Sequence, residues 1–168
     1  MKKNTFKVLK LFIWLLFILY LFILINVIVL KGINPLKITI PNIHRSFIEK
    51  ISSINFIPFK RILYYLGGNE PLTTCVKNIL GNIFAFSPLG FLLPILFKKC
   101  KKIKHIFFVS FILSLSIEIT QVQFYLGSCD IDDIILNVSG AILGFAIYQV
   151  ILRHRWNLLI RNTSPSET

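Results

Sequence analysis

Charged residues are scarce in this chain of 168 residues: they make up 15% of it, and Asp and Glu together number 7. Soluble globular chains carry about 25% charged residues, so the chain falls outside that class. Its hydrophobic fraction of 55%, with 16 Phe, also excludes an intrinsically disordered chain. The class that remains is an integral membrane protein.

Recognisable metal and catalytic motifs are also missing. Cys75, Cys100 and Cys129 lack the spacing of a metal site. The sequence contains no nucleophile elbow, phosphate-binding loop, zinc-protease motif or dinucleotide fingerprint. We therefore expect no metal and no cofactor. Cys75 and Cys129 fall on the same expected side of the membrane, which leaves a disulfide between them open.

Four apolar runs are long enough to cross a bilayer, since about 20 helical residues span roughly 30 Å. They cover residues 11–30, 78–97, 105–126 and 134–152. The first run is too long for the apolar core of a signal peptide and no small-residue cleavage site follows it, which indicates an uncleaved signal anchor. Pro88 predicts a kink in the second helix rather than a break.

Basic residues set the expected orientation. Twelve of the 19 Lys and Arg fall on one side of four spans, in the two tails and in the connection 98–104, whereas seven are spread over residues 31–77. Positive charge marks the cytoplasmic side, so we expect both termini in the cytoplasm. The formal net charge of +12 then reflects topology and attraction to anionic membrane lipids, and it does not indicate a nucleic-acid partner.

The expected architecture is an all-α membrane bundle of four transmembrane helices with one short helix outside. The sequence Pro58-FKRILYYLGG predicts this short helix, lying at the outer interface, although a loop packed on the bundle is an equal alternative. Five segments follow in order: a cytoplasmic tail (1–10), the signal-anchor helix (11–30), an extracytoplasmic loop (31–77), a core of three helices (78–152) and a cytoplasmic tail (153–168).

Polar residues inside the spans are the candidates for function, because burying an ionisable group at the bilayer centre costs about 2.5–3.5 kcal/mol. Glu118 lies nine residues before Gly127, which places it roughly 13 Å below the outer surface and close to the midplane. Gln121 shares its helical face. We expect Glu118 to face the interior of the bundle.

The other two core helices also carry one polar and small face each. The second span presents Asn78, Gly81 and Asn82, and the last presents Asp133 and Asn137 with Gly140 and Gly144. The simplest arrangement turns all three faces toward each other and forms a pocket open to the outside. The residues expected to bind a ligand there are Asn82, Glu118, Gln121, Asp130, Asp133 and Asn137.

Several chemistries fit such carboxylates: holding a hard cation, acid–base catalysis or binding an amine. Spacing does not choose among them. For Asp130 and Asp132 we favour a helix-capping role at the surface, because aspartate is common at helix starts. For Asn137, an interhelical hydrogen bond competes with a functional role.

Four motifs in order resemble the VanZ-like family of bacterial membrane proteins. They are INFIPFKRI (54–62), NIFAFSPLGFLLP (82–94), SLSIEITQ (114–121) and DIDDIILNVSGAILGF (130–145). The resemblance implies a multi-helix protein of the cell envelope, in a family whose named member is associated with low-level resistance to the glycopeptide teicoplanin. Carried over by motif, its key positions add Pro88, Gly90, Gly140 and Gly144, as structural residues, to the polar ones.

The sequence departs from the family in one place. Many relatives carry an arginine just before the aspartate segment, where this chain has Gly127-SCD. If that arginine pairs with the acidic cluster, its role passes to a loop residue such as Lys77 or Arg61, or it is lost in this chain.

Three functions compete at this point. The first is an envelope protein that binds a lipid, a cell-wall precursor or a glycopeptide antibiotic. The second is a lipid-modifying hydrolase or transferase with Glu118 as acid or base. The third is a small transporter with Glu118 as a proton-coupling carboxylate, which would need a homo-oligomer because four spans are few for a carrier.

Overall fold

The computed structural model describes residues 2–30, 54–124 and 129–163. Within these ranges the chain forms α1 (Lys2–Leu30), α3 (Lys60–Leu66), α4 (Leu72–Leu96), the short 3-10 helix η1 (Lys98–Cys100), α5 (Ile103–Gln123) and α6 (Ile131–Thr163). The described part contains no β-strand beyond one isolated bridge. The expected all-α bundle is therefore confirmed.

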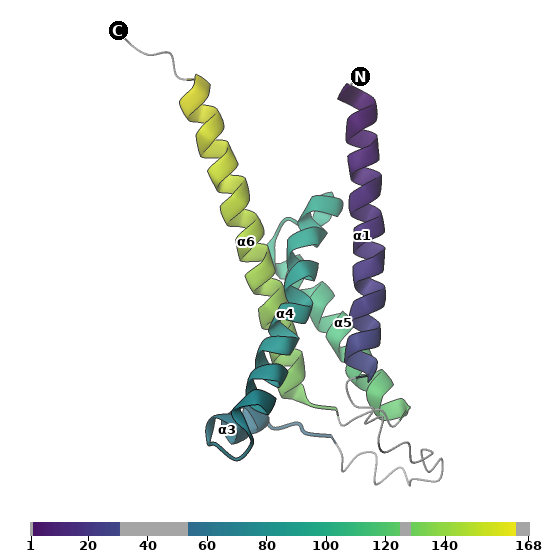
Figure 1. Ribbon diagram of the computed structural model, residues 1–168, viewed down its shortest axis with the longest axis vertical. Helices are drawn as coiled ribbons and strands as arrows, with labels where there is room; N and C mark the ends of the chain where they lie inside the picture. Colours follow the sequence, from purple (N-terminus) through teal and green to yellow (C-terminus); the bar gives the residue numbers. More distant parts are fainter. Residues whose placement is uncertain (1, 31–53, 125–128, 164–168) are drawn as a thin grey trace.

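Four of these helices are long and apolar enough to cross a membrane, and they contain the candidate spans Lys7–Val27, Leu72–Leu96, Ile103–Gln123 and Ile131–Ile151. Consecutive spans run in opposite directions, so the start of α1 and the end of α6 lie at the same end of the bundle (Figure 1). α3 lies at the other end, beside the starts of α4 and α6 (Figure 1). The arrangement is a multi-pass membrane bundle.

The helix bounds differ from the hydropathy runs mainly at the ends near α3. α4 begins six residues before the expected span, directly after Pro71, and α6 begins three residues before it, at Ile131. These additional turns carry polar residues that a hydropathy run leaves out, such as Asp132 in the first turn of α6. α5 ends earlier than expected, at Gln123.

The helices α4 and α6 form the most closely packed pair because glycine removes the side chain where their backbones meet. A Cβ atom on Gly140 would lie 2.2 Å from the carbonyl oxygen of Ile83, and one on Gly144 would lie 1.8 Å from that of Ser87. From the α4 side, a Cβ on Gly90 would lie 1.7 Å from the oxygen of Ala141. The expected close packing at Gly140 and Gly144 is confirmed.

Two other expectations for α4 have different outcomes. The helix continues through Pro88, as expected of a residue that does not break it. Gly81, which we placed on the inward stripe, is exposed, and a Cβ there would meet no atom within 4 Å. That part of the stripe prediction is wrong, because Asn82 occupies the inward position and turns Gly81 away from the other helices.

The remaining core is apolar and draws α1 onto the bundle. Phe86, Ile106 and Ala141 are fully buried between α4, α5 and α6. α1 adds Phe17 and Leu24 to this cluster, and the hydroxyl of Tyr20 donates a 2.7 Å hydrogen bond to the carbonyl of Ala85. Most other apolar side chains of α1 are exposed, as expected for a helix that faces lipid.

Candidate functional site

The polar site begins where the segment before α3 meets the segment before α6. Asn55 and Asp130 form an isolated parallel bridge. The amide of Asn55 donates to the carbonyl of Cys129 at 2.8 Å, and the amide of Ile131 donates to the carbonyl of Asn55 at 3.1 Å. This pairing fixes residues 54–59 against the start of α6, and brings α3 to the same end of the bundle.

Asp130 is the centre of the site and is fully buried. Its Oδ1 accepts hydrogen bonds from the Asn55 side-chain amide and from the backbone amide of Asp132, each at 3.0 Å. Its Oδ2 forms an ion pair with Nε of Arg61 at 2.8 Å. Asp130 therefore caps α6, as the sequence indicated, but its expected place at the surface is wrong because Asn55 and Arg61 cover it.

Asp132 is also fully buried, and it caps a different helix from its own. Its Oδ1 accepts a hydrogen bond from the amide of Phe59, and its Oδ2 accepts from the amides of Arg61 and Ile62 at 2.8 and 3.1 Å. The N-cap residue of α3, Phe59, has a left-handed backbone (φ 64°) and no capping side chain. Asp132 supplies that cap from α6, so its expected surface role is wrong.

Asp133 connects α6 to α4. Its Oδ1 accepts a 2.7 Å hydrogen bond from the side-chain amide of Asn82, which is 3% exposed. Its Oδ2 lies 4.0 Å from Nη1 of Arg61. Asn82 and Asp133 were expected to share one inward site, and this contact confirms that their faces meet.

Glu118 brings α5 into the same cluster. It is 1% exposed, and its Oε2 accepts a 3.0 Å hydrogen bond from the backbone amide of Asp130. The inward orientation is confirmed, and the carboxylate lies closer to the end of its helix than the sequence indicated. α5 ends five residues after Glu118, which is about 7.5 Å along the helix, so the carboxylate lies near the end of the bundle that holds α3.

Gln121, one turn further along α5, is 7% exposed and shares the buried face with Glu118. Deeper in the bundle, the side-chain amide of Asn137 donates a 2.9 Å hydrogen bond to the hydroxyl of Ser114. Asn137 is 1% exposed and lies behind the carboxylate cluster rather than within it. Its contact is the interhelical hydrogen bond that the sequence left as an alternative.

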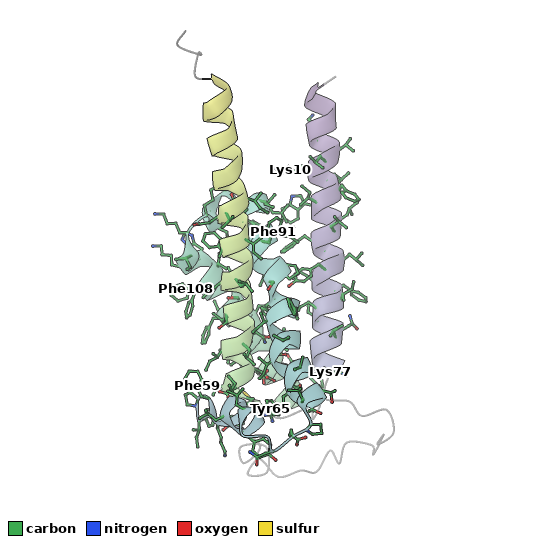
Figure 2. The ribbon with its side chains drawn as sticks, turned by 60° about the vertical axis from the view of Figure 1, so that its left-hand side comes forward. Lys10, Phe59, Tyr65, Lys77, Phe91 and Phe108 are labelled. Carbon is green, nitrogen blue, oxygen red and sulfur yellow. The ribbon has the colours of Figure 1, made fainter. Side chains whose placement is uncertain are left out.

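Arg61 is the cation that the acidic cluster requires. The sequence offered Lys77 or Arg61 for this role, and the structure selects Arg61 through its contacts with Asp130 and Asp133. Lys77 is exposed on α4 at the same end of the bundle, where Figure 2 shows it near Tyr65. A buried carboxylate is costly unless it is paired, so Arg61 stabilises the charge of Asp130.

An open pocket of about 460 Å³ lies beside this cluster, lined by Asn55, Lys60, Arg61, Tyr64 and Asp130. Of the residues that the sequence assigned to ligand binding, Asp130 lines it, whereas Asn82, Glu118, Gln121, Asp133 and Asn137 are not in its lining. Asn55, Lys60 and Tyr64 were not among the residues that the sequence assigned to ligand binding. Asn55 does stand at the start of the INFIPFKRI motif, and that position was the available signal.

The three cysteines of the chain do not form a disulfide. Cys75, Cys100 and Cys129 are all free, so the disulfide between Cys75 and Cys129 is not formed. Partial burial, together with the smaller effect of the neighbouring carboxylates of Glu118, Asp130 and Asp133, raises the pKa of the Cys129 thiol to about 11. Burial likewise raises the pKa of the Tyr65 hydroxyl, which accepts a hydrogen bond from Asn78. Both groups are therefore neutral at physiological pH.

The Asp130 and Asp132 carboxylates at the start of α6 are each occupied by several donors from the chain itself. In residues 2–30, 54–124 and 129–163, no three His, Cys, Asp or Glu side chains are grouped so that they could hold a metal ion. A ligand in the pocket would therefore contact the side chains at its rim, and the carboxylates hold the lining residues in place.

Two comparisons relate this chain to known proteins. The sequence profile of the VanZ/LLP1 family matches residues 17–153. Protein VanZ of Enterococcus faecium is 36% identical over 78 residues, which are 46% of this chain and 48% of that protein. The chain thus aligns with about half the length of this curated relative. No solved structure matches the chain significantly.

Proposed function

Because the chain belongs to the VanZ/LLP1 family, we propose that it binds an amphiphilic ligand at the pocket beside α3 and thereby contributes to antibiotic resistance. The ligand is a membrane lipid, a cell-wall precursor or a lipophilic glycopeptide such as teicoplanin. The observation that carries the proposal is the open pocket lined by Asn55, Lys60, Arg61, Tyr64 and Asp130. It combines cationic, amide and aromatic groups at the end of a membrane bundle, as a pocket for an amphiphile requires.

The walls of the pocket are held rigidly, which supports binding. Segment 54–62 is attached to α6 by a backbone bridge, by the Asp132 cap and by the ion pair between Arg61 and Asp130. A site whose supporting side chains are locked loses little conformational entropy when a ligand binds. The buried carboxylates thus serve the pocket by positioning its lining residues.

The proposed location is the cell membrane with both termini in the cytoplasm, so that the pocket opens to the outside. The distribution of lysine and arginine supports this orientation, and the termini lie at the end opposite α3 (Figure 1). Reporter fusions test it. Green fluorescent protein joined after Thr168 should fluoresce, and alkaline phosphatase at the same position should be inactive. Active phosphatase would show that the orientation is the opposite one.

Glycopeptide susceptibility tests the function itself. A deletion strain should become more susceptible to teicoplanin, and the wild-type gene should restore the original inhibitory concentration. A chain with Tyr64→Ala and Lys60→Gln, expressed at the same level, should fail to restore it, whereas Lys77→Gln should succeed. Unchanged susceptibility of the deletion strain, or full restoration by the pocket variant, would contradict the proposal.

The geometry of Glu118 favours a positioning role over catalysis. Its carboxylate accepts a hydrogen bond from the backbone amide of Asp130, and Glu118 is not among the residues that line the pocket. A general base must come within hydrogen-bond reach of the proton that it removes. We expect Glu118→Gln to leave the membrane lipid profile unchanged; a specific lipid species that accumulates in this variant would instead support a lipid-modifying enzyme.

A further inference from the structure

The two cations of the pocket have different roles. Arg61 is 37% exposed, and its guanidinium is held by Asp130 and Asp133. Lys60 is exposed, and no ion pair to it occurs in the part of the chain that the structure describes. Both cations line the pocket, but Arg61 is held by two carboxylates, so Lys60 is the cation whose charge is available to a ligand. The pocket is therefore suited to an anionic group.

An apolar surface lies on the same short segment as Lys60. Phe56 is 68% exposed, Phe59 53% and Leu63 64%, and Ile57 is also exposed. Figure 2 shows Phe59 at the end of the bundle, on the outside of the ribbon. Large exposed apolar side chains beside a cationic residue are typical of segments that lie in the membrane interface. Apolar chains of a ligand held at Lys60 can lie along this surface.

We propose that the pocket binds the phosphate-bearing headgroup of an anionic membrane lipid, with Lys60 contacting the phosphate and the lipid chains lying along Phe56, Ile57, Phe59 and Leu63. This inference rests on the proposed function and specifies the ligand of the same pocket. The exposed ammonium of Lys60 favours an anionic headgroup at the rim, since the Asp130 carboxylate is fully buried and paired with Arg61. The adjacent apolar surface selects a lipid over a soluble phosphate.

Lipid retention by the full-length protein tests this proposal. The protein is reconstituted in nanodiscs of equal parts phosphatidylglycerol and phosphatidylcholine, released in the mass spectrometer, and scored for bound lipid. The wild-type protein should retain phosphatidylglycerol preferentially. Lys60→Gln should reduce the ratio of bound phosphatidylglycerol to phosphatidylcholine about fivefold, from the loss of one cationic contact at the surface. Lys60→Arg should keep the preference.

Lys77→Gln is the matched control, since it removes one exposed lysine from the same end of the bundle without changing the pocket lining. An equal loss in the Lys60 and Lys77 variants would show a general surface charge effect and overturn the proposal. Titration with glycerol 1-phosphate tests whether a soluble phosphate binds the pocket without lipid chains. Binding of this compound as tight as that of the lipid would overturn the assignment to a lipid.

The outcomes also separate the two proposals. Equal retention of both lipids by the wild-type protein, together with loss of teicoplanin resistance in the pocket variant, would overturn the lipid assignment and keep the proposed function. If lipid retention is selective and depends on Lys60 while the deletion strain keeps its original susceptibility, the two results together would support the lipid site and contradict the role in resistance.

Discussion

Nε of Arg61 lies 2.8 Å from Oδ2 of Asp130, and this ion pair joins the short helix α3 to the start of α6. Asp130 is fully buried, so its charge depends on the arginine. The pair also places both residues in the lining of the pocket. The stability of the end of the bundle that holds α3 and the shape of the pocket therefore depend on the same contact.

Removing this arginine should destabilise the protein more than removing the lysine beside it. Arg61→Ala leaves Asp130 with its two amide donors but without a positive partner, and we expect a loss of about 2 kcal/mol in unfolding free energy. Lys60→Ala should cost less than about 0.5 kcal/mol because Lys60 is exposed. Denaturation in detergent measures both values; similar losses would show that the ion pair does not stabilise the fold.

The Asp132 cap makes a prediction at the level of single amides. Asp132→Ala should increase hydrogen exchange at the amides of Phe59, Arg61 and Ile62 and cost about 1–2 kcal/mol, because the start of α3 loses its acceptors. Glu70→Ala is the control, since Glu70 is exposed beyond the end of α3. Protection that stays the same in the Asp132 variant would mean that α3 is held by other contacts.

Two glycines of α4 should respond in opposite ways to the same substitution. Gly90→Ala places a methyl group against the backbone of Ala141 and should destabilise the bundle by about 2–3 kcal/mol as α4 and α6 separate. Gly81→Ala meets open space and should be neutral or stabilise the helix by up to about 1 kcal/mol. Thermal unfolding of the two variants in one detergent compares them, and equal effects would contradict the close packing of α4 and α6.

Cys129 should react slowly with alkylating reagents near neutral pH. The thiolate is the reactive form, and with a pKa of about 11 the rate should rise about tenfold per pH unit between pH 7.5 and 9.5 without a plateau. The measurement uses iodoacetamide on a chain with Cys75→Ala and Cys100→Ser. Glu118→Gln should shift the curve to lower pH because it removes a neighbouring negative charge. A plateau near pH 9 would show that the thiol is not shielded.

The sequence predicted the features that depend on composition and period. Four spans followed from apolar runs, and the inward orientation of Glu118, Asn82 and Asp133 followed from the cost of burying polar groups in a membrane. For Pro58-FKRILYYLGG the sequence left a short helix and a packed loop as equal alternatives, and the structure contains the helix α3, followed by Gly67 and Gly68. These signals are local, so they can be interpreted without knowledge of the fold.

The features that the sequence did not predict depend on contacts between distant segments. Asp132 caps α3 instead of its own helix, and Asn55 pairs with Asp130, because the chain before α3 folds back onto the start of α6. The periodicity of apolar residues does not indicate that two segments distant in the sequence come into contact. The same contact explains why Asp130 and Asp132 are buried although they look like ordinary surface residues at a helix start.

Cross-linking from the pocket in living cells tests the central claim most directly. A photoreactive phenylalanine analogue at position 64 replaces Tyr64 in the pocket lining, and the same analogue at Leu80, an exposed position of α4, reports the surrounding lipid. After irradiation, mass spectrometry should find one class of anionic amphiphile attached at position 64 and the bulk lipid mixture attached at position 80. The same bulk mixture at both positions would contradict a selective pocket.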